Sequence, residues 1–246
     1  MENISVCMAT YNGARFFCEQ LDSILSQISD NDEIVIVDDC SEDDTVDLIR
    51  AYDDKRIRLF CNSENLGVNK TFEKAISLAC GEYIFLSDQD DIWHAGRLII
   101  MRDALDKANA LLVTTRFSCI DENGNKNIMI QPILYSSDST KYIKNVFSIF
   151  MNRCDYYGCA MAFKAKLKRI ILPFPLYIES HDLWIALAAN IFHANLHLEY
   201  LSLFHRIHDS NTSVVQRNIL RRICGRIILF ISAIHLLLRR CIYFVK

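Results

Sequence analysis

The chain has 246 residues, a formal net charge of -3, 51% hydrophobic residues and 23% charged residues, which excludes a disordered chain and fits one large domain or a domain with a modest appendage. The charge is unevenly divided, because residues 1–109 contain 10 Lys and Arg against 22 Asp and Glu, whereas residues 110–246 contain 17 against 8. So acidic an N-terminal half argues against nucleic-acid binding and is compatible with a bound metal ion.

Short runs rich in Val, Ile and Phe predict strands in the first part of the chain. They lie at residues 4–9, 33–39, 57–60 and 83–88. Helical spacing of apolar residues predicts helices between them, at residues 15–28, 43–52 and 69–79. Because strand and helix alternate, we expect an α/β fold with a Rossmann-like, mainly parallel sheet flanked by helices.

A polar cluster follows each of these predicted strands. The clusters read TYNG, DDCSEDD, NSENLG and SDQDD in chain order. Ligands of an open parallel sheet bind beyond the carboxyl ends of its strands, so we expect a binding site at this edge. Part of the polarity has a simpler interpretation, since Ser41 or Asp43 can cap a helix and Gly13 and Gly67 suit tight turns.

The second half of the chain has a less regular pattern. The sequence predicts a helix at 95–108, a strand at 111–121 and a hairpin turn at 121–126. Farther along, residues 156–164 favour a strand and residues 181–192 favour a helix.

The last 35 residues, 212–246, contain six Arg, one Lys and no acidic residue, and they surround an apolar run at 227–238. This run is too short to span a bilayer, which takes about 20 residues. It predicts a basic amphipathic helix that lies on an anionic membrane surface. The alternative is a terminal helix that packs on its own domain or on a partner.

Ten cysteines are scattered along the chain without a CxxC pair, which argues against a zinc knuckle. Several lie in apolar runs, as expected for buried thiols in a reducing cytosol. The start MENISVCMATYNG has neither a basic region nor a long apolar region, so we expect no cleaved signal peptide and a cytoplasmic location.

Asp88 and Asp90 lie two residues apart at the end of the predicted strand 83–88. If the pleat continues through them, both carboxylates point the same way. Such carboxylates repel each other unless a proton or a cation intervenes, and oxygen ligands favour Mg²⁺ or Mn²⁺. An ion held by one or two carboxylates keeps open positions for phosphates, so a nucleotide diphosphate is the expected ligand. The alternative is a solvated acidic loop, in which Asp-x-Asp occurs by chance.

Asp38 and Asp39 close the second predicted strand in the same setting. One of them could accept hydrogen bonds from a nucleobase or a ribose. The alternative is an acidic loop that starts a helix, because Asp near a helix N-terminus is stabilising without any ligand.

Taken in order, these stretches resemble family 2 glycosyltransferases, which have the GT-A fold. The resemblance rests on SVCMATYNG, IVIVDDCSEDDT, ENLGVNKTFEKAISLACGEYIFLSDQDDIW and the later HDLW. The set is most similar to the bacterial rhamnosyltransferase-like branch and covers roughly residues 3–210. It implies a GT-A domain at residues 1–211, with a nucleotide-binding half at 1–109 and an acceptor half at 110–211. Residues 212–246 would form a C-terminal helical extension.

The resemblance assigns residues of the N-terminal half to the donor. Ala9 and Tyr11 would line the nucleotide pocket, and Asp39 would contact the base. Asp88 and Asp90 match the metal and diphosphate motif of the family. Cys40 departs from the family, which has a glycine at this position.

Further residues come from the rest of the chain. Asp182 in ESHDLW matches the position of the catalytic base, although its place before an apolar helix also suits an N-terminal helix acid. Arg206 and His208 in FHRIHDSN would meet the diphosphate, with His208 also a metal ligand. Trp93 could stack on a sugar ring, whereas an aromatic residue with apolar neighbours is more often part of the core.

The resemblance implies an inverting displacement at the anomeric carbon of a dTDP- or UDP-sugar, with rhamnose favoured and Mg²⁺ or Mn²⁺ as the cofactor. The acceptor would be a saccharide or a lipid-linked glycan in cell-surface polysaccharide synthesis. The protein would act in the cytoplasm, as a peripheral protein on the inner face of the cell membrane.

Three other functions are compatible with parts of the sequence. A haloacid-dehalogenase-like phosphatase also uses Asp-x-Asp after a strand, but there the pair ends the first strand of the domain. A nucleotide-sugar-binding protein without turnover would retain the binding residues. Such a protein would not need a catalytic base at Asp182. A membrane scaffold built around the C-terminal helix leaves the polar strand ends unexplained.

Overall fold

The computed structural model of the chain describes residues 3–131, 134–151, 153, 156–209 and 219–245. Within these residues, nine strands form one sheet with the order β3-β2-β1-β4-β8-β6-β9-β5, and β7 pairs with β6 outside this path. The strands are β1 (Ile4–Thr10), β2 (Glu33–Asp38), β3 (Ile57–Cys61), β4 (Tyr83–Ser87), β5 (Ile92–Trp93), β6 (Leu112–Ile120), β7 (Lys126–Gln131), β8 (Met161–Lys164) and β9 (Asn195–Arg206).

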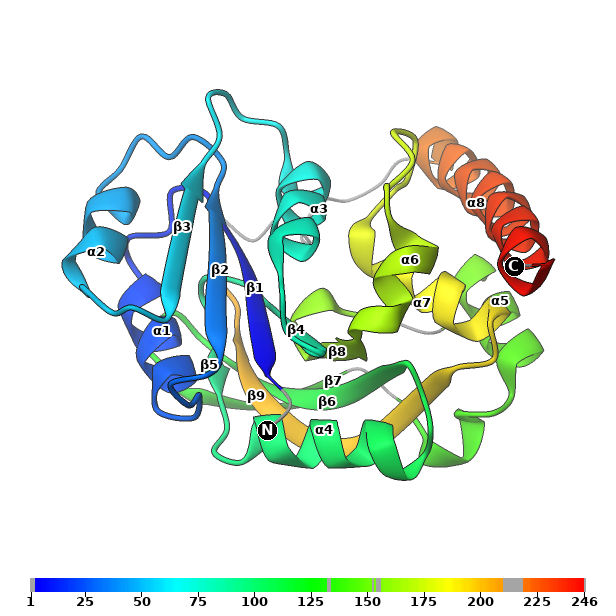
Figure 1. Cartoon of the computed structure of the whole chain (residues 1–246), viewed down its shortest axis with the longest axis horizontal. Coiled ribbons are helices and arrows are strands. Elements are labelled where there is room, and N and C mark those ends of the chain that lie inside the picture. The colour runs from blue at the N-terminus through cyan, green and yellow to red at the C-terminus, as the bar shows by residue number, and fades with distance from the viewer. Residues whose placement is uncertain (1–2, 132–133, 152, 154–155, 210–218, 246) are drawn as a thin grey trace.

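Helices lie on both faces of this sheet (Figure 1). The α-helices are α1 (Phe17–Leu25), α2 (Thr45–Ala51), α3 (Val68–Leu78), α4 (Arg97–Lys107), α5 (Tyr142–Phe150), α6 (Lys168–Ile171), α7 (His181–Ile191) and α8 (Ile219–Val245). Short 3-10 helices are η1 (Ser136–Asp138), η2 (Gly158–Ala160) and η3 (Ala165–Leu167). The predicted α/β fold is confirmed.

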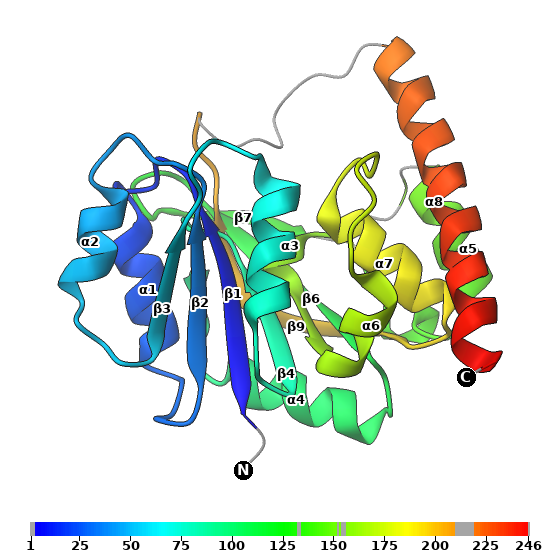
Figure 2. The same ribbon diagram turned by 45° about the horizontal axis from the view of Figure 1, so that its top comes forward.

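The N-terminal half of the sheet is parallel, as the alternation of strand and helix predicts. β1 pairs with β2 and β4, and β2 pairs with β3, all in parallel. The registers align Thr10 with Asp38 and Met8 with Ser87. The polar clusters that follow these strands therefore meet at one edge of the sheet, where the carboxyl ends of β1 and β2 lie together (Figure 2).

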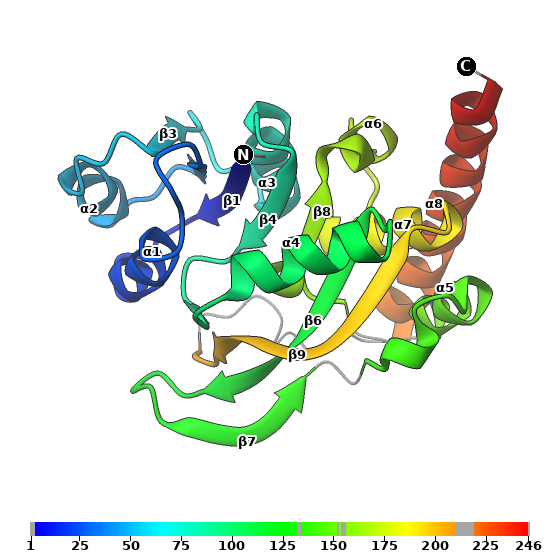
Figure 3. The same cartoon turned by 60° about the horizontal axis from the view of Figure 1, so that its bottom comes forward.

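The second half of the sheet is mixed rather than parallel. β8 pairs antiparallel with β4 and β6, whereas β9 runs parallel to β6. Figure 3 shows β9 alongside β6, and α4 packs against both strands. The sheet is continuous through the predicted nucleotide-binding and acceptor halves. The predicted boundary at residues 211–212 lies outside the described residues.

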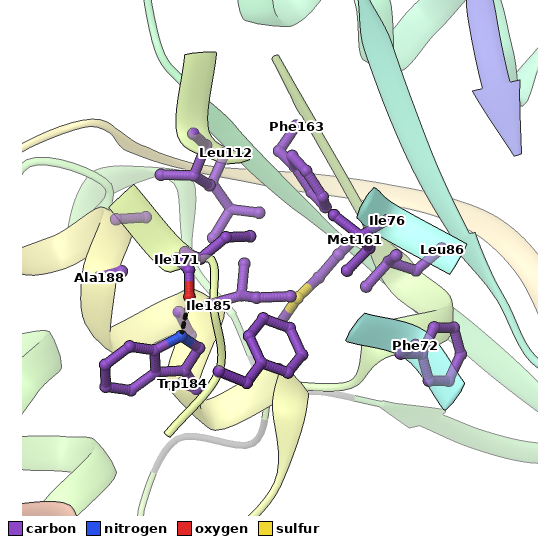
Figure 4. Close-up of a cluster of buried hydrophobic side chains, with 14 of the residues drawn as sticks. Phe72, Ile76, Leu86, Leu112, Met161, Phe163, Ile171, Trp184, Ile185 and Ala188 are labelled. Carbon is purple, nitrogen blue, oxygen red and sulfur yellow. Dashed lines mark hydrogen bonds between the residues drawn. The ribbon is translucent and has the colours of Figure 1, made fainter. Parts of the chain in front are cut away.

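Alternate side chains of the strands feed two buried cores, one on each face of the sheet. Ile34 and Ile36 of β2 belong to the core that includes α1 and α4. Val35 and Val37 belong to the other core, with α3, α6 and α7. Figure 4 shows this second core, where the indole N–H of Trp184 donates to the Ile171 carbonyl at 2.9 Å. Burial on both faces explains why the strands are apolar runs rather than alternating ones.

The C-terminal helix α8 is longer than the predicted apolar run 227–238. It packs against α5, α6 and α7 at the far end of the molecule from α2 (Figure 1). Among the described residues, no helix has the length and the apolar character that crossing a membrane requires. The nine described cysteines are free thiols.

Candidate active site

The loops after β1 and β2 are joined by hydrogen bonds between backbone and short polar side chains. The Asn12 N–H donates to Ser41 Oγ at 2.9 Å, and the Glu42 N–H donates to Asn12 Oδ1 at 2.8 Å. Asp43, proposed above as a helix cap, also accepts a hydrogen bond from the Ala14 N–H at 3.1 Å. The polarity of these loops thus has a structural part, because each loop satisfies the backbone groups of the other.

Asp39, the expected base contact, lies at the end of β2 and is buried. Its carboxylate accepts hydrogen bonds from Asn62 Nδ2 at 2.8 Å and from the backbone N–H groups of Leu66 at 2.9 Å and Gly67 at 2.8 Å. It therefore anchors the loop that precedes α3. A carboxylate has about four acceptor positions, so these three bonds leave one for a ligand donor.

Cys40 has a φ of 68°, in the left-handed region that favours glycine. This explains why a glycine is usual here in the family that the sequence resembles. The left-handed conformation costs a residue with a Cβ about 1 to 2 kcal/mol. Glycine avoids this cost but loses more conformational entropy on folding.

We expect Cys40→Gly to raise the free energy of unfolding by up to about 1 kcal/mol, measured by urea denaturation. Cys40→Ala is the matched control, since alanine removes the thiol and retains the Cβ that causes the strain. A Gly variant less stable than the Ala variant would contradict this account.

Gln89, in the middle of SDQDD, joins the loop after β4 to the loop after β1. Its side-chain amide bonds both backbone groups of Tyr11, accepting from N–H at 2.9 Å and donating to the carbonyl at 3.0 Å. Gly13 permits this approach, because a Cβ there would lie 2.2 Å from Gln89 Oε1. Tyr11, the expected nucleotide contact, is thereby held with its side chain exposed. Ala9 lies half-buried at the end of β1.

The loop after β4 is also tied to the end of β9. Buried Asp91 accepts hydrogen bonds from His205 Nδ1 at 2.8 Å and from the Arg206 N–H at 3.2 Å. Burial opposes ionisation of His205, but its contact with Asp91 outweighs this and raises the pKa of the imidazole to about 9. His205 is therefore a buried cation beside the carboxylates at neutral pH. No local pattern in the sequence predicts this pair, since 114 positions separate its members.

Arg206 is buried and crosses the same loop. Its Nε donates to the Asp90 carbonyl at 3.0 Å, and its guanidinium lies 4.6 Å from the centre of the Phe16 ring. It also forms an ion pair with Glu19 of α1. Arg206 was expected to meet a diphosphate directly, whereas in this structure it positions the acidic loop and pairs with a carboxylate.

His208 and Asp90 are in direct contact, with His208 Nε2 and Asp90 Oδ2 2.8 Å apart. Burial and the neighbouring Asp91 raise the pKa of Asp90, while His208 acts in the opposite direction. A carboxylate oxygen and an imidazole nitrogen at this distance can both bind one divalent ion, and this donor set suits Mn²⁺ or Mg²⁺. Two of the three residues that the resemblance implies as metal ligands, Asp90 and His208, therefore lie together.

Asp88 carries the most unfavourable charge of the cluster. Burial raises its pKa to about 8, and repulsion from Asp91 and Asp90 contributes further. Burial is the main cause of the shift, and the positive charge of His205 opposes it. A divalent cation would relieve this repulsion, so Asp88 stays a predicted ligand beside Asp90 and His208.

Asp182, the expected base, lies in the first turn of α7 and is half-buried. Its charge also raises the pKa of Asp88. The two carboxylates are therefore close enough to interact, although 94 positions separate them in the sequence. Asp182 Oδ1 accepts a hydrogen bond from the Leu183 N–H at 2.7 Å, as the alternative of an N-terminal helix acid requires, so the residue suits both interpretations.

His181 precedes the expected base and is buried. Its ring stacks on Phe72 with centres 4.1 Å apart, and a Cβ at Gly158 would lie 2.6 Å from its Nε2. Among the described residues neither ring nitrogen has a hydrogen-bond partner. Burial lowers its pKa, so the ring is neutral.

Trp93 does not lie where a sugar could stack on it, which corrects the expectation from the sequence. It is 4% exposed, with its ring 6.0 Å from Phe85 and 4.4 Å below the Arg97 guanidinium. Its strand β5 is only two residues long and pairs with β9, which covers it. The structure thus agrees with the alternative given above, an aromatic residue of the core.

Asp91, Cys159 and His205 form a second group that could hold a metal, with ligand atoms within 4.8 Å of one another. Burial raises the pKa of the Cys159 thiol well above its usual value, so the sulfur is protonated. Thiol sulfur is a soft ligand, whereas Mg²⁺ and Mn²⁺ prefer oxygen ligands. We therefore regard Asp91 and His205 as residues that position the neighbouring loop.

Comparison with known proteins identifies the class to which this fold and site belong. The structure resembles that of Staphylococcus aureus TarS in complex with UDP-GlcNAc, with a TM-score of 0.73 and 19% identity over 94% of this chain and 66% of that chain. It also resembles a mannosyltransferase from Pyrobaculum calidifontis in complex with GDP-Man and Mn²⁺, with a TM-score of 0.62 and 21% identity over 94% of this chain and 64% of that chain. These similarities confirm the GT-A fold.

The sequence match is to Glycosyl transferase family 2, whose family model covers residues 5–171. The chain belongs to this family. It is 27% identical to WfaP of Escherichia coli, a UDP-Glc:alpha-D-GlcNAc-diphosphoundecaprenol beta-1,3-glucosyltransferase, over 98% of this chain and 96% of that protein. The chain spans only 30% and 55% of the lengths of the first two curated relatives that it matches.

Proposed function

We propose that the chain is an inverting glycosyltransferase that uses a nucleotide diphosphate sugar. The observation that carries this proposal is the contact of His208 Nε2 with Asp90 Oδ2 at 2.8 Å in the acidic loop after β4. A displacement at a sugar carbon needs positive charge near the leaving group and a base near the attacking hydroxyl. The acid pair after β4 could hold a cation for the first purpose, and the acid at the start of α7 could serve as the base.

In the proposed reaction, an acceptor hydroxyl oxygen attacks the anomeric carbon from the face opposite the nucleotide. The new C–O bond forms as the bond to the diphosphate oxygen breaks, and the electron pair of that bond leaves with the diphosphate. Asp182 takes the hydroxyl proton, which contributes about 10² to 10⁴ in rate. Asp88, Asp90 and His208 would hold Mg²⁺ or Mn²⁺, which supplies positive charge to the leaving diphosphate when bound.

The remaining site residues have supporting roles in this proposal. Tyr11 and Ala9 would contact the nucleotide, and Asp39 would accept a hydrogen bond from the base with its remaining acceptor position. Arg206 and His205 hold the acidic loop in place by their bonds to Asp90 and Asp91. Their positive charge limits the repulsion in the loop before a metal binds.

The donor is proposed as a UDP- or dTDP-sugar. WfaP is named for UDP-Glc, and TarS is bound to UDP-GlcNAc, so UDP-glucose and UDP-GlcNAc join dTDP-rhamnose as candidates. The preference for rhamnose stays a prediction from the sequence. We propose a saccharide or lipid-linked acceptor in cell-surface polysaccharide synthesis, and a cytoplasmic site of action at the inner face of the cell membrane.

The test is a panel of nucleotide sugars assayed for stabilisation against heat with and without Mn²⁺. The true donor should raise the melting temperature only when the metal is present, because a ligand of the folded state shifts the unfolding equilibrium. Asp88 is protonated below about pH 8 in the metal-free protein, and binding a metal would release this proton. Metal-dependent stabilisation should therefore strengthen from about pH 6 towards pH 8. Equal stabilisation with and without metal at both pH values would contradict the proposed metal site.

The alternatives from the sequence have less support. The acid pair follows β4, whereas a haloacid-dehalogenase-like phosphatase has it after the first strand. A binding protein without turnover remains distinguishable by assay, since it would bind the donor and transfer no sugar. The GT-A resemblance and the family membership favour the transferase.

A further inference from the structure

The outward side of α8 is apolar along most of its length. Phe230 and Leu238 are each 60% exposed. The same side carries further large exposed apolar residues at helical spacing: Ile223, Ile227, Ile234 and Ile242. Since each residue advances about 100° around a helix, these six side chains occupy an arc of about 120°. We refer to them as the outer apolar face of α8.

The opposite side of α8 holds the helix on the domain through buried Leu229 and Leu236 and through polar contacts. Arg239 NH1 donates to the Ile170 carbonyl at 2.7 Å, and Arg239 NH2 donates to the Pro173 carbonyl at 2.7 Å. His235 Nδ1 lies 2.6 Å from the Tyr177 hydroxyl. An amphipathic helix of a globular domain ordinarily buries its apolar side. α8 buries Leu229 and Leu236 in this way but leaves its outer apolar face exposed, so the exposed side needs an explanation.

Neighbouring segments extend this apolar surface. Leu176 is exposed and precedes Tyr177, the residue that contacts α8. Ile143 and Phe147 are also exposed, and they lie on α5, which contacts α8. Figures 1 and 3 both place α5 next to α8 at the end of the molecule remote from α2. Isolated exposed apolar residues are normal, but six of them at helical spacing along one side of α8 mark an interaction surface.

The segments that border the outer apolar face are basic. Residues 138–179, which include α5 and α6, contain seven Lys and Arg against three acidic residues, and residues 219–245 contain five Arg and no acidic residue. A second copy of the chain docking by twofold symmetry would place the same positive border against itself. An anionic lipid surface complements both the apolar arc and the positive border.

We propose that the outer apolar face of α8, with Ile143, Phe147 and Leu176 beside it, lies on the surface of an anionic lipid bilayer. The apolar side chains enter the boundary of headgroups and acyl chains, and the arginines on the inward side attach the helix to the domain. The inference rests on the proposed function for its purpose, because a lipid-linked acceptor would then meet the enzyme at the bilayer. The docking surface itself is defined by exposure and charge.

The experiment is flotation of the full chain with vesicles of phosphatidylglycerol and phosphatidylcholine, compared with phosphatidylcholine alone. The wild-type chain should float with the anionic vesicles. The double variant Phe230→Glu/Leu238→Glu should bind them at least about 10-fold more weakly, because two charges would enter the apolar boundary. Ile99→Glu is the matched control, since Ile99 is 58% exposed on α4 and away from α8, and it should float like the wild type.

Two results would overturn the proposal. One is equal flotation of the double variant and the wild type. The other is a wild-type chain that does not bind anionic vesicles but sediments as a dimer, with the double variant monomeric. Circular dichroism checks that the variant is folded, and its stabilisation by donor and Mn²⁺ should match the wild type. Loss of vesicle binding with intact donor binding separates this surface from the sugar-transfer site.

Discussion

Asp90→Ala should lower kcat/KM for sugar transfer by about 10³-fold or more and abolish stabilisation by donor and Mn²⁺. Asp90 Oδ2 lies 2.8 Å from His208 Nε2. Removing the Asp90 carboxylate therefore deletes one proposed metal ligand and removes this contact of the other, His208. Without the ion, the developing charge on the leaving diphosphate would be stabilised only by the remaining cations of the site. Transfer is measured with the donor that the thermal panel identifies.

The control for Asp90→Ala is Asp103→Ala on α4, which removes an exposed carboxylate paired with Arg102. It should retain full transfer. The metal-free stability of Asp90→Ala should change little, because relief of repulsion with Asp91 offsets the lost contact with His208. Normal turnover in Asp90→Ala would remove this residue from the site, and a collapse of its metal-free fold would point to a purely structural role.

The N-terminal half of the fold could be predicted from the sequence because its signals are local. Each parallel strand is an apolar run, each is followed by a polar loop, and the chain returns through a helix before the next strand. Parallel strands align their carboxyl ends, so Asp39 and Asp88 could be expected at one edge without knowledge of any distant contact.

The second half could not be predicted in the same way, because its pairing is not local. β9 pairs in parallel with β6 and antiparallel with the two-residue strand β5. Leucines at positions 196, 198, 201 and 203 give part of the alternation expected of a strand, and this signal could have located β9. No pattern along the chain predicts that His205 at its end meets Asp91, or that β9 buries Trp93.

The C-terminal helix illustrates a different limit. The sequence predicts that α8 has a basic side and an apolar side, but it does not determine which side faces the domain. That choice depends on the partners available: here Leu229 and Leu236 enter the core, and backbone carbonyls near the end of α6 accept hydrogen bonds from Arg239. The arginines expected at the membrane edge of the helix therefore include one that attaches it to the domain.

Asp182→Asn should lower kcat by about 10² to 10⁴ while donor and metal binding stay near normal. Asparagine has nearly the same volume, and its side-chain oxygen can still accept the hydrogen bond that Leu183 N–H donates to Oδ1 at 2.7 Å. The start of α7 should therefore be preserved. Loss of the Asp182 charge also removes one source of the raised pKa of Asp88, so the metal site would ionise more easily and bind at least as well.

The competing interpretation is that Asp182 only stabilises the N-terminus of a helix. Asp47→Asn is the matched control, since Asp47 is the acidic residue in the first turn of α2 and is exposed. Each substitution should cost about 0.3 to 1 kcal/mol of stability through the helix dipole. Only Asp182→Asn should lose transfer if Asp182 is the base, because the acceptor proton then has no carboxylate to receive it. Full kcat in Asp182→Asn, with a stability loss like that of Asp47→Asn, would reduce Asp182 to a helix acid and leave the base to be sought elsewhere.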